Sequence, residues 1–489
     1  MTSEEIKALR NEPWREALRK NINAKQRSSI ERVQMPELSP EYRVTTFTEE
    51  VQQGLSADQA RLEAQRCLDC ADPSCMKGCP VGINIPTFVK HIEAGEFLEA
   101  ARTIKQTSSL PAVCGRVCPQ EKQCEGQCIH LKMGHKAVAI GYLERFAADY
   151  ERESGCVQVP ECAPSNGKRI AVVGSGPAGL AFASDMIKWG YDVTVFEALH
   201  EIGGVLKYGI PEFRLPNRVV EAEIDLLRKM GVRFMPDVIV GKTLSYEDLK
   251  QEGFEGIFVA SGAGLPRFMN IPGENACGVM SSNEYLTRIN LMGAGREGYA
   301  TPILKADNVA VIGGGNTAMD SARTAKRMGA KRVMLVYRRS IDEMPARREE
   351  IHHAMEEGIE FLTLHNPIEY HTDERGRVKE MVLQVMELGE PDASGRRSPV
   401  PVEGKTVTLP AEVVVVAVGV SPNPLIPNSI SALEVSRRGT IVADEQTLRS
   451  SVEDIYVGGD IYRGGATVIL AMGDGRTAAA AMHKQLQGE

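Results

Sequence analysis

Short apolar runs, each followed by a glycine-rich turn, recur along the part of the chain that follows Lys168. The run Ile170 to Val173 leads into a glycine loop, a helix-prone stretch and a second run, Val193 to Phe196. The same order recurs with the runs Val309 to Ile312 and Val333 to Tyr337. A strand, a loop, a helix and a second strand form a βαβ unit. The pattern therefore predicts an α/β fold with two doubly wound, Rossmann-like nucleotide-binding domains.

The residues before Lys168 follow a different pattern. Residues 1 to about 60 are polar and helix-prone, and between Cys67 and Tyr150 helical stretches alternate with cysteine-rich loops in which no strand is predicted. Residues 151–167 carry Pro, Gly and Ser and are typical of a linker. We therefore expect an N-terminal helical domain over residues 1–165.

Composition and charge exclude several classes of protein. The 489 residues are 43% hydrophobic, and no apolar stretch reaches the ~18 residues needed to span a bilayer. The formal charge of -8 argues against nucleic-acid binding, which needs a basic face. The start of the chain is charged and lacks the apolar core of an export signal. We expect a soluble, cytoplasmic protein with no membrane or nucleic-acid partner.

Most of the 11 cysteines fall into two runs. The runs are Cys67, Cys70, Cys75 and Cys79, and then Cys114, Cys118, Cys124 and Cys128. Thiolates at such spacings can converge on a soft metal centre. One alternative is a binding module in which zinc knuckles accompany a degenerate nucleotide fold, since zinc favours paired short CxxC motifs.

Two features of the runs favour iron-sulfur clusters over zinc. The runs are unequal, and Cys79 and Cys118 precede proline, as in bacterial ferredoxin loops, where the Cys before Pro ligates the other cluster of a pair. Redox-inert zinc would also have little purpose beside two dinucleotide sites. We therefore predict two clusters with crossed ligation.

The first glycine loop contains Gly174, Gly176 and Gly179 in GxGxxG spacing between a strand and a helix. Its glycines allow a tight turn and let backbone N–H groups at the start of the helix approach a pyrophosphate. Glu197 ends the second strand, where a carboxylate can accept hydrogen bonds from an adenosine ribose. This loop is predicted to bind FAD or NAD.

The second glycine loop is followed by a strand that ends in arginines. A carboxylate there would repel a 2′-phosphate, whereas guanidinium groups bind it through forked, charge-assisted hydrogen bonds. NADPH is therefore predicted in preference to NADH, at a site formed by Gly313, Gly315, Asn316, Thr317, Arg338 and Arg339. Arg347 and Arg348 lie further on in a helix-like stretch and are expected at the surface.

Taken together, the motifs resemble a known family over nearly the whole chain. They are CLDC, GCPVGINIP, CGRVCPQEKQCEGQC, IGYLERF, VVGSGPAGL, GGVLKYGIPEFRLP, GGGNTAMDSA, VYRRS, EMPA and VGGD. The family is that of the small (beta) subunit of NADPH-dependent glutamate synthase. It includes the large subunit of NADH-dependent ferredoxin:NADP oxidoreductase and the N-terminal half of dihydropyrimidine dehydrogenase. The resemblance implies FAD at the Gly174 loop, NADPH at the Gly313 loop and two [4Fe-4S] clusters.

The resemblance also implies domain ranges and site residues. The NADPH domain, residues 301–419, is expected as an insertion into an FAD domain made of residues 166–300 and 420–489. Further FAD residues carried over are Glu197, Gly204, Leu206, Arg214, Gly459, Asp460, Ala466, Thr467 and Val468. One cluster would be held by Cys67, Cys70, Cys75 and Cys128, and the other by Cys79, Cys118, Cys124 and Glu144, which leaves Cys114 outside both sets.

The function implied is electron transfer from NADPH through FAD and the clusters to a flavin, FMN, on a partner protein. No acid-base catalytic side chain is needed, because the cofactors carry the redox chemistry. The partner would be the large subunit of a glutamate synthase. The alternative is the NADPH-handling subunit of an electron-bifurcating ferredoxin:NADP transhydrogenase, with a small-subunit partner and a ferredoxin-type acceptor.

Overall fold

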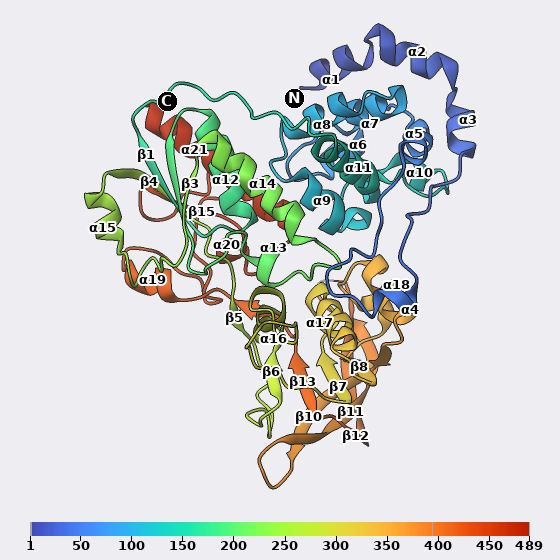
Figure 1. Ribbon diagram of the computed structural model, residues 1–489, viewed down its shortest axis with the longest axis vertical. Coiled ribbons are helices and arrows are strands. Elements are labelled where there is room, and N and C mark those ends of the chain that lie inside the picture. The colour runs from blue at the N-terminus through green and yellow to red at the C-terminus, as the bar shows by residue number, and fades with distance from the viewer. Residues whose placement is uncertain (1, 394, 489) are drawn as a thin grey trace.

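A computed structural model describes residues 2–393 and 395–488 of the chain, and its N-terminal part is helical (Figure 1). The helices are α1 (Ser3–Arg10), α2 (Pro13–Asn21), α3 (Ala24–Ser29), α4 (Pro40–Arg43), α5 (Ala57–Gln65), α6 (Ser74–Lys77), α7 (Ile85–Ala94), α8 (Phe97–Lys105), α9 (Pro111–Val117), α10 (Ile129–Lys132) and α11 (Ile140–Glu153), with the short helical turns η1 (Gln120–Lys122) and η2 (Glu125–Gln127). Capping explains several of these boundaries. A capping box between Ser56 and Gln59 begins α5, and α7 ends at Gly95 with a φ of 85°.

The first sheet consists of parallel strands in the order β15-β4-β1-β2-β3. The strands are β1 (Arg169–Val173), β2 (Asp192–Phe196), β3 (Arg233–Met235), β4 (Phe254–Val259) and β15 (Ile455–Val457). Helices α12 (Pro177–Lys188) and α21 (Val468–Gln487) lie against this sheet, and α14 (Asn217–Met230) packs on α12 (Figure 1). Because helices and loops cover it, the central strands are buried almost throughout, as parallel strands usually are.

The second sheet is also parallel, in the order β6-β13-β7-β8-β9. The strands are β6 (Val279–Ser281), β7 (Asn308–Ile312), β8 (Arg332–Tyr337), β9 (Glu360–Thr363) and β13 (Val413–Val416), with helices α16 (Ser282–Leu286), α17 (Asn316–Arg327) and α18 (Arg348–Glu356). An antiparallel sheet of β10 (His365–Thr372), β11 (Val378–Pro391) and β12 (Arg397–Pro410) extends to the end of the molecule opposite the N-terminal helices (Figure 1).

The second unit is inserted into the first, as the family resemblance implied. The chain leaves the first unit through β5 (Leu265–Pro266) and returns through β14 (Val420–Ser421), and these strands pair with each other. The C-terminal strand β15 then joins β4 in the first sheet. Strand β6 comes from outside the range 301–419 that was expected for the inserted unit. It is three residues long and has no glycine loop after it, so its sequence gives no sign of the sheet it joins.

The remaining elements are short. They are α13 (Val205–Tyr208), α15 (Tyr246–Gln251), α19 (Leu425–Ser429), α20 (Asp460–Arg463), η3 (Thr287–Leu291) and η4 (Ile341–Glu343). Within the described parts of the chain, we find no helix with the length and apolar character needed to cross a membrane.

The helical part and the first unit share one hydrophobic core. Phe88 and Val113 of the helical part belong to the same buried cluster as Leu180 and Met472 of the first unit. Separate domains joined by a mobile linker would each have a core of their own. The two parts therefore hold a fixed position relative to each other.

Candidate functional site

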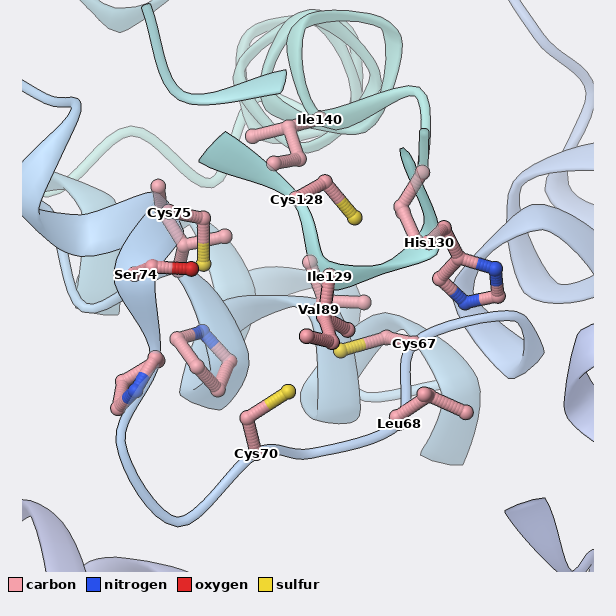
Figure 2. A pocket seen from close by; sticks show the side chains of 14 residues that line it. Cys67, Leu68, Cys70, Ser74, Cys75, Val89, Cys128, Ile129, His130 and Ile140 are labelled. Atoms are coloured by element: carbon pink, nitrogen blue, oxygen red, sulfur yellow. The ribbon is translucent and has the colours of Figure 1, made fainter. Parts of the chain in front are cut away.

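The first group of cysteines lines a cavity in the helical part. Cys67, Cys70, Cys75 and Cys128 all face it (Figure 2). They come from the loop after α5, from α6 and from the junction of η2 and α10. Cys67, Cys70 and Cys75 are half-buried and Cys128 is buried. We call these four residues the outer sulfur group.

The thiols of the outer sulfur group influence one another. Burial raises the pKa of Cys67 to about 11. Burial also raises the pKa of Cys75, and Cys67, Cys128 and Cys70 raise it further. A metal centre that stabilises thiolates is the usual means of keeping such buried sulfurs deprotonated.

A second group contains Cys79, Cys118, Cys124 and Glu144, which we call the inner sulfur group. Burial raises the pKa of Cys124, and Glu144, Cys118 and Cys79 contribute in the same direction. Burial raises the pKa of Glu144 to about 8. Its Oε1 atom is buried and has no hydrogen-bond partner among the described residues. A carboxylate oxygen on the helix surface would be hydrated, whereas this buried one lacks a partner and calls for an explanation. That Glu144 is a metal ligand stays a prediction.

The residue types in the two groups suit iron-sulfur chemistry. The outer group offers four thiols, and the inner group offers three thiols and one carboxyl. Iron-sulfur clusters are held mainly by Cys thiolates. The residues present therefore fit clusters.

The loop between Cys67 and Cys70 is fixed by a residue that sequence reasoning missed. Asp69 is fully buried and has a backbone φ of 52°, which is rare for residues other than glycine. Its carboxylate pairs with Arg15, and with Arg19 at 2.5 Å, while Arg10 Nε donates to its carbonyl oxygen at 2.7 Å. The N-terminal helices α1 and α2 are thereby tied to the outer sulfur group. The acidic residue inside the CLDC motif was the sequence signal that could have drawn attention to Asp69.

The first glycine loop follows β1 as expected. Gly174 has a φ of 104°, and a Cβ at Gly179 would lie 2.1 Å from the Gly174 carbonyl oxygen, so both positions require glycine. Gly176 is the N-cap of α12. Gly204 packs closely against it, and a Cβ at Gly204 would lie 3.0 Å from the Cα of Gly176. Backbone at this helix start is open to a pyrophosphate.

Glu197 is buried at the end of β2 beside the glycine loop. Its Oε2 accepts hydrogen bonds from the backbone N–H of Ser175 at 2.9 Å and from its hydroxyl at 2.5 Å. Ser175 was not singled out from sequence, because a variable position inside GxGxxG gives no sign of its contacts. Leu206 is fully buried nearby in α13.

The C-terminal residues predicted for FAD lie at the same edge of the first sheet. Gly459 and Asp460 follow β15, which runs parallel to β1, so both segments end at the carboxyl edge. Asp474, also missed from sequence, accepts the Gly459 N–H at 3.0 Å and pairs with Arg463. Ala466, Thr467 and Val468 follow at the start of α21, where Thr467 is the N-cap.

Arg214 lies between the two units in an ion-pair network. It pairs with Asp320 of α17 at 2.7 Å and with Glu350 of α18 at 3.0 Å. Its guanidinium is thus engaged by the inserted unit. The role that the resemblance implies for Arg214 in FAD binding stays a prediction.

The second glycine loop precedes α17. Gly313 has a φ of 145°, and Gly315 is the N-cap. Thr317 is exposed, and Asn316 Oδ1 accepts the N–H of Arg347 at 2.9 Å.

The arginines after β8 have different surroundings. Arg338 is exposed, and no hydrogen bond or ion pair of its side chain is found among the described residues. Arg339 is buried, pairs with Asp392 at 2.6 Å and donates to the Arg397 carbonyl at 2.7 Å. Of the two, Arg338 has the free guanidinium that a 2′-phosphate needs.

The expectation that Arg347 lies at the surface is wrong. It is 5% exposed, and its guanidinium donates to the Arg116 carbonyl at 2.5 Å and to Gln120 Oε1 at 3.0 Å. These partners precede and follow Cys118 in the helical part. A polar run in the sequence could not indicate this contact because the partner residues are 231 and 227 positions away.

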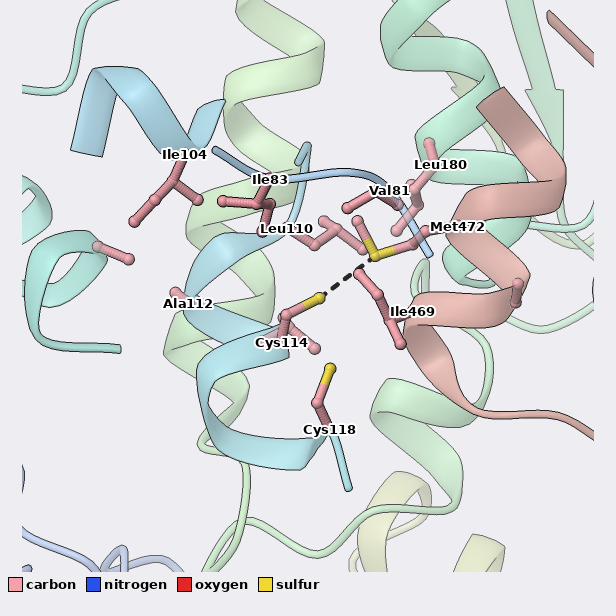
Figure 3. Packing of buried hydrophobic residues seen from close by; sticks show 14 of the residues in the cluster. Val81, Ile83, Ile104, Leu110, Ala112, Cys114, Cys118, Leu180, Ile469 and Met472 are labelled. Atoms are coloured by element: carbon pink, nitrogen blue, oxygen red, sulfur yellow. Dashed lines mark hydrogen bonds between the residues drawn. The ribbon is translucent and has the colours of Figure 1, made fainter. Parts of the chain in front are cut away.

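Helix α21 follows the predicted flavin residue Thr467 and contacts the helical part, where Figure 3 shows Met472 directed at Cys114 beside Cys118. Thr467 Oγ1 accepts a hydrogen bond from Gln123 Nε2 at 3.3 Å. One turn further on, Met472 Sδ lies 3.4 Å from the thiol of Cys114, which is fully buried and close to Cys118. Cys114 therefore lies at the junction between the helical part and the first unit.

Comparisons with known proteins agree with this geometry. Residues 43–156 match the family model described as dihydropyrimidine dehydrogenase domain II, 4Fe-4S cluster, and residues 168–475 match that of pyridine nucleotide-disulphide oxidoreductases. The match to a 4Fe-4S model contradicts the zinc-knuckle alternative.

Two curated relatives and one solved structure illustrate the range of matches. The chain is 36% identical to the NADPH glutamate synthase small chain of Azospirillum brasilense over 92% of this chain and 94% of that one. It is 37% identical to the NADP(+)-dependent formate dehydrogenase subunit beta of Moorella thermoacetica over 84% of this chain and 60% of that one. The NADPH complex of FprA from Mycobacterium tuberculosis matches with a TM-score of 0.56 and 21% identity, over 67% of this chain and 85% of that one, which shows a shared fold.

Proposed function

Because the chain belongs to the family of NADPH-dependent glutamate synthase small chains, which are flavin and iron-sulfur oxidoreductases, we propose that it oxidises NADPH and delivers single electrons to a partner protein. When bound, FAD takes a hydride from NADPH and the iron-sulfur clusters carry its electrons singly. The residues of the chain hold and orient these groups.

The observation that supports this proposal most directly is the position of α21. Its first turn carries the predicted flavin residues Thr467 and Val468, and Met472 one turn later contacts Cys114 beside the inner sulfur group. A single rigid helix thus sets the separation between the flavin site and that group. The N–H groups at its start also favour negative charge, which suits a reduced flavin.

The two sulfur groups take different roles in this proposal. Two of the three cysteines of the inner group, Cys118 and Cys124, are buried and Cys79 is half-buried, whereas only one of the four cysteines of the outer group is buried. We assign one [4Fe-4S] cluster to each group, with Glu144 as the fourth ligand of the inner one. The outer cluster then faces the partner.

The two nucleotide sites differ in the charge of the side chains that line them. Glu197 with Ser175 orders the first glycine loop for the ribose and pyrophosphate of FAD, and Asp460 lies at the same sheet edge for the ribityl chain. Arg338 at the end of β8 binds the 2′-phosphate of NADPH.

The test is anaerobic purification followed by iron and flavin analysis and a titration with NADPH. We expect one FAD and about eight irons per chain, and bleaching of the flavin together with the cluster absorbance. Glu144→Ala should lower the iron content by about half, while Glu153→Ala, which replaces a 72% exposed side chain on the same helix, should not. Full iron in Glu144→Ala, or flavin bleaching without cluster reduction, contradicts the proposal.

The partner decides between the two candidate activities. A large subunit with amidotransferase and FMN domains that co-purifies with the chain supports a glutamate synthase. A small partner with FAD and a [2Fe-2S] cluster supports the bifurcating transhydrogenase. More than one acceptor should be tested, because similar chains are subunits of different enzymes. One relative is named as a glutamate synthase small chain and another as a formate dehydrogenase subunit.

A further inference from the structure

The segment that follows Cys128 differs from its surroundings in charge and exposure. Leu131 to Lys136 are six consecutive exposed residues, and Leu131 and Met133 are each 47% exposed. The segment carries Lys132, His135 and Lys136 and no acidic residue, in a chain with a formal charge of -8. None of these three basic side chains makes an ion pair within the described part of the chain. We call residues 131–136 the basic segment.

The basic segment lies at the edge of the cavity that the outer sulfur group lines. Cys128, Ile129 and His130 line this cavity and lead directly into the segment (Figure 2). The segment then folds back on the cavity wall. The backbone N–H of His135 donates to the His130 carbonyl at 2.9 Å, and the two imidazole rings lie 6.1 Å apart.

The backbone at the C-terminal end of the segment is held in place, although the side chains of the segment face solvent. Arg66 Nη2 donates to the Lys136 carbonyl at 2.6 Å, and Arg66 Nη1 and Arg32 both donate to the Ala137 carbonyl. An anchored backbone loses little entropy when a partner binds. Exposed apolar side chains among unpaired charges of one sign are typical of a surface for transient association.

We propose that the basic segment and the rim of the outer cavity form the docking surface for an acidic electron-accepting protein. Its negative surface would face Lys132, His135 and Lys136, while Leu131 and Met133 would exclude water at the centre of the contact. This inference rests on the proposed function, because it takes the outer cysteines as the exit for electrons. Charge complementarity steers association and fixes orientation, so the effect should depend strongly on salt.

The test uses the anaerobic holoprotein and an acidic [2Fe-2S] ferredoxin as the probe, with the basic protein cytochrome c as the opposite charge. Lys132→Glu with Lys136→Glu should slow NADPH-dependent ferredoxin reduction roughly tenfold or more at low ionic strength. The loss should fade as salt rises, and carbodiimide cross-linking to ferredoxin should fall in parallel. The matched control is Lys379→Glu with Lys405→Glu, which reverses two exposed charges on β11 and β12, far from the helical part (Figure 1).

A second variant separates apolar contact from charge. Leu131→Ser with Met133→Ser should weaken ferredoxin binding without changing its salt dependence. Unchanged ferredoxin reduction and cross-linking in the lysine variant, or an equal loss in the control, overturns the docking proposal. Reduction of a small neutral dye by NADPH reports on the proposed function separately. If the wild type fails with the dye, the proposed function is wrong, whereas a variant that fails only with ferredoxin supports the docking surface.

Discussion

Replacing Glu357 by Gln tests the ion network that fixes the inserted unit against the rest of the molecule. Glu357 is the C-cap of α18, and its side chain is fully buried, as is that of Arg323, which pairs with it at 2.8 Å. Arg327 at 2.8 Å and Arg43 at 2.9 Å also bind it. Arg43 belongs to α4 of the N-terminal part, which descends to this helix (Figure 1). The substitution Glu357→Gln would keep the shape of the side chain but remove the anion that three buried cations share. Arg323 would keep Glu350 and Arg43 would keep Glu356.

The structure gives the size of the effect. Burial alone would raise the pKa of Glu357, but Arg323 and Arg327 lower it from 4.5 to about 2. At ~1.4 kcal/mol for each pKa unit, the charged form of Glu357 stabilises the folded state by about 3 kcal/mol. Removal of one partner of a buried ion pair typically costs about 3–5 kcal/mol, in agreement with this value. For a unit of this size the melting temperature should fall by roughly 6–12 °C.

Calorimetry of the purified holoprotein measures this change, and its pH dependence identifies the cause. Because the folded pKa is lowered, the stabilisation is complete above the unfolded pKa near 4.5 and is lost as the pH falls through about 2. The difference between wild type and Glu357→Gln should therefore be full at neutral pH and shrink below about pH 4.5. The control is Glu356→Gln, since Glu356 is 34% exposed and binds Arg43 alone among the arginines of this network, so its loss should cost less than about 1 kcal/mol. Equal melting temperatures for the two variants would refute the reasoning.

Three further predictions concern the sites. Gly179→Val should abolish FAD retention, because even a Cβ at this position would lie 2.1 Å from the Gly174 carbonyl oxygen; flavin absorbance after purification measures this, and normal flavin content would count against the loop assignment. Arg338→Ala should raise the KM for NADPH roughly tenfold to a hundredfold and leave that for NADH unchanged, because a charged hydrogen bond contributes about 1.5–3 kcal/mol; equal changes for both nucleotides would exclude a 2′-phosphate contact. Asp69→Asn should loosen α1 and α2, because the buried Arg15 loses its anion. Hydrogen exchange in α2 should then rise and iron should be lost faster in air, whereas unchanged exchange in α2 would show that the ion pairs do not hold these helices.

The two units and their nucleotide loops could be predicted from sequence because their determinants are local. Alternating strand, glycine loop and helix appear within about thirty residues of chain. Gly174 and Gly179 are required by contacts only a few residues away. The grouping of cysteines into ligand sets came from the resemblance and stays a prediction. The structure places Cys128 beside cysteines of the first run and Cys79 near Cys124.

The surroundings of individual charged residues could not be predicted in this way. Arg338 and Arg339 are neighbours in sequence, yet one is exposed and the other is buried against Asp392. Arg347 resembles a surface residue in sequence but is buried against the helical part. Strand β6 joins a sheet that its three residues do not identify.

The sequence by itself determined the fold class, the two glycine loops and the residue types available for sulfur ligation, since each depends on periodicity, steric freedom or chemistry within a short stretch. Only the tertiary structure decided which charges are buried together and how the units are joined. Arg43 and Glu357, for example, are 314 positions apart. A contact of that kind depends on the whole folded chain, because each partner is an ordinary surface residue until the fold removes both from water.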